Sequence, residues 1–404
     1  MFISALSVVM GAPPATAVTE YFDAFHATGA HLWQTGLPVE IDGWLDAGHP
    51  GFRYVTWVDQ NGNSSANGQR LGGVAPRAGR IGYQIGDEPL DFAQLQTMQS
   101  GGAAALLADP SGLTILNLSP DGAKGPLATQ GAAMPQFDVL SVDDYTYRRG
   151  AYQSLSGLRT AALANGKPYW RYLDGFRFTT QTDNSTESDY RWDAYVGATW
   201  GYTGHTWFIY QIDPGNPDLV PSFFTTKGVY GSARTAQFQW AATLNQQLAS
   251  LGRTLSLLRS TDVRYVASLV QPAGTTAFTR GAGGDPYLTR VAPPSGTFAD
   301  VALGFFVDDC GEHYLMVQSQ RHQDADFPNS SQASTTFKVE LDFAGAIDST
   351  LDRTAVMVLD PVTDVIAPRA LTSTGASTAT LDLVLPAGGG VLLKYKNGRP
   401  FARQ

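Results

Sequence analysis

Short apolar runs alternate with segments of helical periodicity through the first 265 residues. Apolar residues repeat at helical spacing over 16–29, 90–98, 152–166, 189–204 and 232–252, which predicts helices there. The runs themselves cover 2–9, 30–38, 52–59, 81–89, 113–120, 137–147, 167–176 and 205–213. They are apolar without alternation, as in parallel strands covered on both faces. Eight such units favour an α/β fold, a (β/α)8 TIM barrel, over an open doubly wound sheet.

The pattern changes to period 2 beyond residue 265. Apolar and polar residues alternate over 301–309, 313–320, 335–343, 354–361 and 379–396, with turn residues between them. This predicts a C-terminal antiparallel β-sandwich domain. We therefore expect a barrel over residues 1–265 and a β-sandwich over 266–404, with an irregular Gly/Pro-rich connection at 271–297.

Composition narrows the classes of partner. The 404 residues are 43% hydrophobic and 16% charged, which is enough apolar sequence for a large core. A net charge of -9 without any Lys/Arg cluster argues against nucleic acid, because phosphate binding needs concentrated positive charge. The single Cys310 excludes an internal disulfide and is expected as a small buried hydrophobe. The six histidines lack metal-ligand spacing, so we expect no metal and no cofactor.

The N-terminal 18 residues allow two interpretations. They contain an apolar run and an Ala-Thr-Ala that resembles a signal-peptide cleavage site, but no Lys or Arg precedes the run. We interpret them as the first barrel strand. No other apolar segment reaches the ~20 residues that cross a bilayer. A soluble protein without membrane insertion is expected; secretion, with the native signal peptide absent from this chain, and the oligomeric state stay open.

Polar and aromatic residues gather at the C-terminal ends of the predicted strands. These ends converge on one rim of a barrel, where barrel active sites lie. Asp87 and Glu88 follow the fourth strand as adjacent acids, although their charges repel and burial is costly. The strand-end residues are Trp33, Gln34, Trp57, Asp59, Asp87, Glu88, Asn117, Asp143, Asp144, Tyr145, Arg171, Asp174, Tyr210 and Gln211.

Two carboxyl groups beside a glycosidic bond can cleave it. One donates a proton to the leaving oxygen while the other attacks the sugar carbon, activates water or supports a substrate group that attacks. Glu88 is the candidate general acid/base, because its neighbour's charge and aromatic burial would raise its pKa. The candidates for the second carboxyl are Asp174, Asp143 and Asp87. The candidates for substrate binding are Trp33, Trp57, Tyr145, Trp170, Arg171, Trp207, Tyr210 and Gln211, with two of the four tryptophans expected in the site.

The chain contains four stretches, "GYQIGDEP", "DVLSVDDYTY", "PYWRYLDGF" and "GHTWFIYQI", and a small β-domain that follows them. In these features it resembles TIM-barrel glycoside hydrolases of the broad clan of β-galactosidases and cellulases. That clan ends its fourth strand in Asn-Glu-Pro and its seventh in a nucleophilic Glu. Here the fourth strand ends in Asp-Glu-Pro, which implies Glu88 as acid/base, and Asp174 stands near the nucleophile's position. The Asp-Glu pair also resembles hexosaminidases, in which the Asp orients a nucleophilic 2-acetamido group, and this implies Asp87 as a partner. The resemblance implies a glycosidase acting on a neutral or N-acetylated oligosaccharide or polysaccharide.

Other interpretations remain open at this point. Glu88 can cap the next helix, Asp174 can be a turn residue, and Asp143 or Asp144 can pair with a following arginine. Geometry favours Asp174 or Asp143 over Asp87 as the partner, because successive strand residues point to opposite faces. A carbohydrate-binding protein on a catalytically altered barrel is the alternative function, and a second carboxyl beside Glu88 would argue against it. A barrel lyase or aldolase is third, since no strand end carries a Lys or a metal-binding cluster.

Overall fold

The computed structural model describes residues 2–8, 30–35, 53–59, 79–145, 151–179, 186–212, 216–221, 223–227, 232–323, 332–346 and 350–404. Of β1, β2, Ala151, Gln211 and Pro221 it describes the backbone. The helix expected over residues 16–29 lies outside the described residues.

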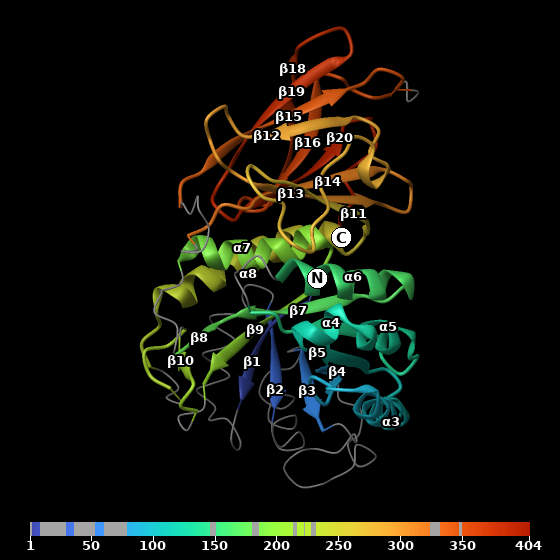
Figure 1. Ribbon diagram of the computed structural model, residues 1–404, viewed down its shortest axis with the longest axis vertical. Helices are drawn as coiled ribbons and strands as arrows, with labels where there is room; N and C mark the ends of the chain where they lie inside the picture. The colour runs from blue at the N-terminus through green and yellow to red at the C-terminus, as the bar shows by residue number, and fades with distance from the viewer. Residues whose placement is uncertain are drawn as a thin grey trace.

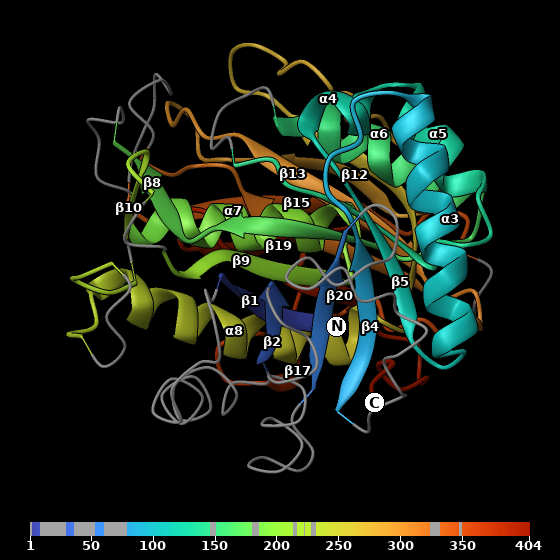
Figure 2. The ribbon, with the colours of Figure 1, turned by 90° about the horizontal axis from the view of Figure 1, so that it is seen from below.

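Eight parallel strands form a closed barrel, in the order β1-β2-β3-β4-β5-β6-β7-β9. The last strand pairs in parallel with the first, which closes the sheet. These strands coincide with the eight apolar runs, so the parallel barrel expected from the sequence is confirmed (Figure 1, Figure 2). Their bounds are β1 (Phe2–Val8), β2 (Ala30–Thr35), β3 (Tyr54–Val58), β4 (Arg80–Ile85), β5 (Leu113–Leu118), β6 (Val139–Val142), β7 (Tyr169–Asp174) and β9 (Gly204–Gln211).

Helices cover the outside of the barrel. Within the described part they are α3 (Phe92–Ala108), α4 (Pro120–Lys124), α5 (Pro126–Ala133), α6 (Ala151–Ala164), α7 (Glu187–Trp200) and α8 (Ala236–Leu255). Asp91 caps α3 by accepting a hydrogen bond from the Gln94 amide. Helices α4 and α5 were not identified from the sequence. Both helices place a proline in their first turn, where its missing N–H is tolerated.

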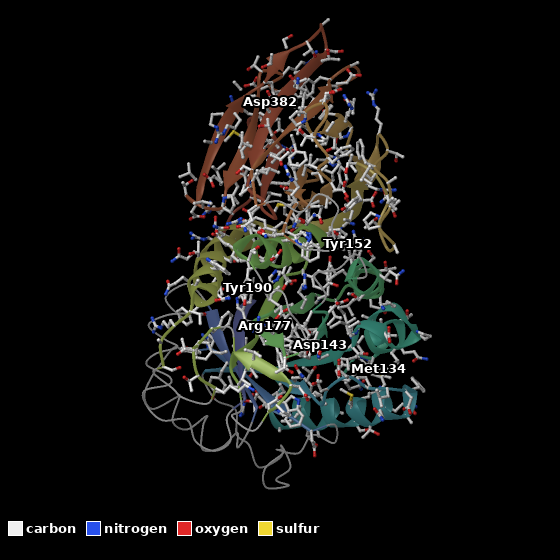
Figure 3. The ribbon with its side chains drawn as sticks, turned by 60° about the vertical axis from the view of Figure 1, so that its left-hand side comes forward. Met134, Asp143, Tyr152, Arg177, Tyr190 and Asp382 are labelled. Carbon is white, nitrogen blue, oxygen red and sulfur yellow. The ribbon has the colours of Figure 1, made fainter. Side chains whose placement is uncertain are left out.

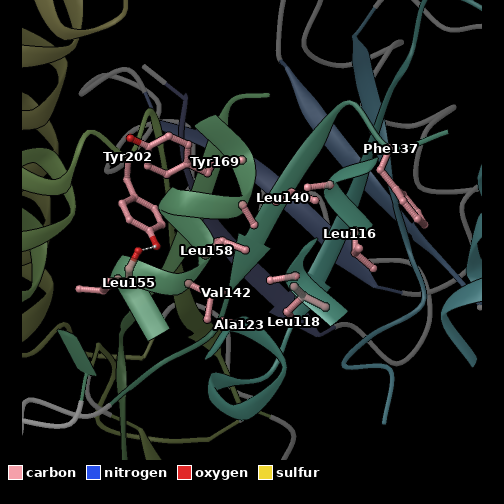
Figure 4. Packing of buried hydrophobic residues seen from close by; sticks show 14 of the residues in the cluster. Leu116, Leu118, Ala123, Phe137, Leu140, Val142, Leu155, Leu158, Tyr169 and Tyr202 are labelled. Carbon is pink, nitrogen blue, oxygen red and sulfur yellow. Dashed lines mark hydrogen bonds between the residues drawn. The ribbon is translucent and has the colours of Figure 1, made fainter. Parts of the chain in front are cut away.

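Strand alternation decides which side chains face the barrel interior. Leu116 and Leu118 of β5, with Leu140 and Val142 of β6, pack outward against the helices, as Figure 4 shows. Ile115 and Val139, one residue out of phase with them, belong to the interior cluster instead. Because side chains alternate along a strand, Asn117 and Ser141 share the interior face.

Bulky side chains fill the barrel interior. Trp170 and Tyr172 of β7 pack there with Val55 of β3. Gly204 makes room for the indole, since a Cβ at this position would lie 2.2 Å from Cγ of Trp170. This part of the interior is therefore a packed core, as is usual for TIM barrels.

Two antiparallel sheets make up the C-terminal part. One has the order β11-β13-β14-β20-β16-β17 and the other β12-β15-β19-β18. Side chains of both sheets, such as Phe305 and Phe337, share one core, an arrangement consistent with a β-sandwich. The strands are β11 (Arg259–Val266), β12 (Leu288–Ala292), β13 (Val301–Val307), β14 (His313–Ser319), β15 (Thr335–Asp342), β16 (Ala355–Asp360), β17 (Val365–Ala370), β18 (Thr372–Ser373), β19 (Thr378–Leu385) and β20 (Gly390–Tyr395), and a 3₁₀ turn covers Ala282–Gly284.

Two details of the C-terminal part differ from expectation. The connection at 271–297 is not irregular throughout, because β12 forms within it and pairs with β15. Cys310 is exposed rather than buried, since it lies in the turn between β13 and β14.

Helices α7 and α8 lie between the barrel and the six-stranded sheet (Figure 1). Gly304 of β13 allows this sheet to approach α7 closely, because a Cβ there would lie 2.2 Å from the Thr199 carbonyl oxygen. The sheet begins with β11, so residue 265 falls within one of its strands. The division into two domains at this residue stays a prediction.

A short two-stranded sheet was not expected from the sequence. Strand β8 (Phe176–Phe178) follows β7 after Gly175 and pairs antiparallel with β10 (Leu219–Pro221). Gly175 is tightly enclosed, and a Cβ there would lie 3.0 Å from the Ile209 nitrogen. The chain thus extends beyond the end of β7 as an ordered strand that pairs with β10, although α7 and β9 lie between the two strands in the sequence.

Candidate active site

The turn after β4 has an unusual backbone conformation. Gly86 has φ 59° and Glu88 has φ 38°. Glycine adopts positive φ freely, but for glutamate this region is sparsely populated and strained. A straight strand would direct Asp87 and Glu88 to opposite faces. In this turn the charges of both carboxyls act on the same third group, Asp143.

Asp143 follows β6 and is the carboxyl with the most perturbed environment. Burial raises its pKa well above the ordinary value, and the charges of Asp87 and Glu88 raise it further. Three carboxyls therefore lie close together after β4 and β6, which favours the neutral form of Asp143. In Figure 3, Asp143 lies farther from the C-terminal sheets than Tyr152 and Tyr190 do.

Asp87 is held by two amide groups. Nδ2 of Asn117 donates to its Oδ1 at 2.9 Å, and Nε2 of Gln84 donates to the same oxygen at 3.2 Å. The Tyr172 hydroxyl donates to Oε1 of Gln84 at 2.8 Å, which fixes the amide orientation. Burial raises the pKa of Asp87 to about 6, the Asn117 hydrogen bond opposes this, and the charge of Glu88 adds to it. More than a third of the Asp87 surface is exposed, so solvent reaches the carboxyl although protein surrounds it on most sides.

Asp174 lies at the end of β7 and is buried. Its Oδ1 accepts a hydrogen bond from the Phe176 amide at 3.0 Å, a bond to the second residue along that is typical of an aspartate turn. Its charge acts on Tyr145, whose pKa is raised first by burial and then by Asp143 and other groups including Asp174. The structure thus brings Asp87, Glu88 and Asp143 together as one cluster, and Asp174 acts on Tyr145 beside it.

Three residues expected to bind substrate face the outer helices. Arg171 is buried and donates to the Asp193 carboxylate and to its carbonyl at 3.0 Å on α7. Nε1 of Trp207 donates to Oδ1 of Asn245 on α8 at 2.7 Å. Tyr210 is buried in the core beneath α8. Strand alternation explains Arg171, because its neighbours Trp170 and Tyr172 face the interior. Trp207 and Tyr210 are three residues apart, and both reach the outer core because the register of β9 shifts after Trp207.

The remaining expected substrate residues fall into three groups. Tyr145 is half-buried beside the acid cluster. Trp57 is half-buried and pairs in register with Gln84 on β4. Strand β4 lies between Trp57 on β3 and Asn117 on β5. Trp170 fills the interior. The side chains of Trp33 and Gln211 lie outside the described residues.

Gln84 and Tyr172 contribute to the cluster but were not proposed from the sequence. Both sit inside the strands rather than at their ends. A signal was present in the run "IGYQI", because a glutamine in a buried strand needs a hydrogen-bonding partner. Tyr172 shares the phase of Asp174 on β7, which places both on the interior face.

Comparisons with known proteins identify the fold. No protein-family model matches this chain, and no curated protein matches it in sequence. A glycoside hydrolase family 5 structure from Bacteroides vulgatus covers 100% of this chain and 91% of its own, with 11% identity and a TM-score of 0.56. A noncanonic maltogenic α-amylase from Thermotoga neapolitana covers 98% of each chain at 12% identity and TM-score 0.51. A putative α-galactosidase from Bacteroides fragilis covers 98% of this chain and 78% of its own at 10% identity and TM-score 0.53. The chain therefore has the fold of the TIM-barrel glycoside hydrolases.

Helix length and polarity also decide whether a helix can span a membrane. Within the described ranges, no helix combines the length and the apolar character needed to cross a membrane.

Proposed function

We propose that the protein is a glycoside hydrolase that cleaves an O-glycosidic bond in a neutral or N-acetylated glycan, with Glu88 and Asp143 as the catalytic carboxyl pair. The clustering of Asp87, Glu88 and Asp143 carries the proposal, since the charges of Asp87 and Glu88 both act on Asp143. Glycosidases need one protonated and one ionised carboxyl at the reacting bond. The shared fold with a family 5 glycoside hydrolase, an α-amylase and a putative α-galactosidase supports the same reaction class.

The two carboxyls differ in their environment. The sequence favoured Glu88 as general acid/base. Burial and the neighbouring charges raise the pKa of Asp143, which favours Asp143 as the carboxyl that carries the proton in the resting site. Glu88 then acts as the nucleophile or base. Either order supplies one acid and one base or nucleophile.

Asp87 has a separate role in this proposal. Two amide donors hold its Oδ1, and hydrogen bonds from neutral donors favour the ionised carboxylate. An ionised Asp87 can orient a polar substrate group, such as a 2-acetamido group, beside the reacting carbon. If it does, an Asp87→Ala variant loses activity most on N-acetylated substrates.

The carbohydrate-binding alternative assumed that the barrel had lost a carboxyl. Asp143 supplies a second carboxyl beside Glu88, which argues against that alternative. The binding protein therefore remains a weaker candidate than the enzyme.

The test begins with a panel of aryl glycosides, with the anomer of the first product identified by NMR. Glu88→Gln and Asp143→Asn are then compared on substrates with poor and good leaving groups. Loss of the acid should reduce the rate by a factor on the order of 10²–10⁴ on a substrate with a poor leaving group. The reduction should be much smaller with dinitrophenolate, which leaves without a proton. Loss of the nucleophile or base should reduce both rates. Wild-type turnover by both variants on the poor leaving group would contradict the proposal.

A further inference from the structure

Four aromatic rings form a continuous strip from the acid cluster toward the surface. We call Tyr145, Phe208, Phe176 and Phe178 the aromatic strip. Tyr145 lies beside Asp143, and its ring centroid is 5.1 Å from that of Phe176 and 5.4 Å from that of Phe208. Phe176 in turn lies 4.8 Å from Phe178. Two ring-to-ring steps therefore connect Tyr145 with Phe178.

Phe178 is the exposed end of the strip, and it is held in place. The ring is 41% exposed, whereas Phe176 behind it is 2% exposed. The planes of the two rings are at 87°, an edge-to-face contact. Phe178 also pairs in register with Leu219 of β10. An aromatic ring that is supported by its strand and its neighbour loses little conformational entropy when a ligand covers it.

Two of the four expected tryptophans do not occupy this position. Trp170 and Trp207 are buried in cores on either side of the barrel wall. The two-stranded β8–β10 sheet supplies an aromatic surface instead, on the strand that follows the Asp174 end of β7.

We propose that Phe178 binds a sugar ring of the substrate outside the reacting unit, so that the enzyme prefers oligosaccharides to monosaccharide glycosides. Sugars present apolar C–H faces, and aromatic rings supply a large, rigid apolar surface for them. The inference rests on the proposed function. The aromatic strip connects the exposed ring of Phe178 with Tyr145 beside Asp143, so a sugar unit on Phe178 would lie on the same side as the acid cluster in this proposal.

The experiment measures kcat/KM on aryl glycosides of one, two and three units of the sugar that the panel identifies. The variants are Phe178→Ala, Phe178→Leu and Phe178→Trp. Phe298→Ala is the matched control, since Phe298 is 52% exposed in the C-terminal part. The wild type and the control should gain at least tenfold in kcat/KM with added units. The Ala and Leu variants should lose most of that gain, while the Trp variant should keep it.

An equal gain with chain length in the Ala, Leu and wild-type proteins would overturn the role of Phe178. Thermal unfolding of each variant separates a folding defect from a binding defect. If the wild type hydrolyses nothing in the panel, the proposed function fails. Calorimetric titration of the panel's oligosaccharides then tests Phe178 by itself: weaker binding by Phe178→Leu than by Phe178→Trp supports the sugar surface, and equal or absent binding overturns it.

Discussion

Removal of the Asn117 amide should raise the pKa of Asp87. Nδ2 of Asn117 donates to Oδ1 of Asp87 at 2.9 Å, and this bond favours the ionised carboxylate. Asn117→Ala removes the donor and leaves the longer Gln84 hydrogen bond in place. The substituted side chain is on the interior face, where it makes no contribution to the outer core beneath α4 and α5.

The size of the change follows from the hydrogen bond. A hydrogen bond to a charged group contributes roughly 1.5–3 kcal/mol, and one pKa unit corresponds to about 1.4 kcal/mol. Because solvent reaches Asp87, water replaces part of the lost interaction, so the low end applies. The pKa of Asp87 should therefore move from about 6 to about 7.

The assay is the pH dependence of kcat/KM, which reports ionisations of the free enzyme. If Asp87 acts as a carboxylate, activity falls as the pH drops through its pKa. The acidic limb should then move to higher pH in Asn117→Ala. Ser141→Ala is the matched control: Ser141 pairs in register with Asn117, and its buried hydroxyl has no hydrogen-bond partner in the described part of the chain. An acidic limb that stays in place in Asn117→Ala, or moves equally in Ser141→Ala, would refute the reasoning.

Two further predictions concern stability. Arg171→Met leaves Asp193 buried without its cation, which should lower the free energy of unfolding in urea by about 3–5 kcal/mol; a fully stable variant with a raised KM would instead restore Arg171 as a substrate contact. Gly204→Ala forces a Cβ against Trp170 and should destabilise the barrel by about 1–3 kcal/mol, measured by thermal unfolding. Trp170→Leu in the same chain should recover part of that loss, and an unchanged melting temperature in Gly204→Ala would contradict the packing argument.

Much of the fold follows from hydrophobic periodicity. The runs at β4, β5 and β7 are apolar on both faces, because one face meets helices and the other meets the barrel interior. The same reasoning missed helices and a strand in segments that are rich in glycine and proline. The Gly/Pro-rich segment of α4 and α5 resembles a loop, and β12 lies in a connection rich in glycine and proline. Tertiary packing determines these elements more than local preference does.

The candidate site was predictable to a smaller extent. Strand ends identified Asp87, Glu88 and Asp143 as rim residues, and the structure brings them together. The same argument also selected Arg171, which faces α7. A strand has two faces, and a strand that is apolar on both faces does not reveal which one meets the barrel interior. The structure decides this: Trp170 and Tyr172 face the interior, so Arg171 faces outward, whereas Asp174 has the phase of Tyr172.

The adjacent acids after β4 now have a physical explanation. A positive φ at Glu88 strains the backbone, and the gathering of Asp87, Glu88 and Asp143 adds charge repulsion, so the arrangement is unfavourable for folding on both counts. Two features offset it: the amide donors on Asp87, and the raised pKa of Asp143, which favours its neutral form. A carboxyl that favours its neutral form, beside two further carboxyls at the open end of a barrel, suits the proposed acid–base cleavage. The same strain would have no use in a cap for α3, because Asp91 already caps that helix.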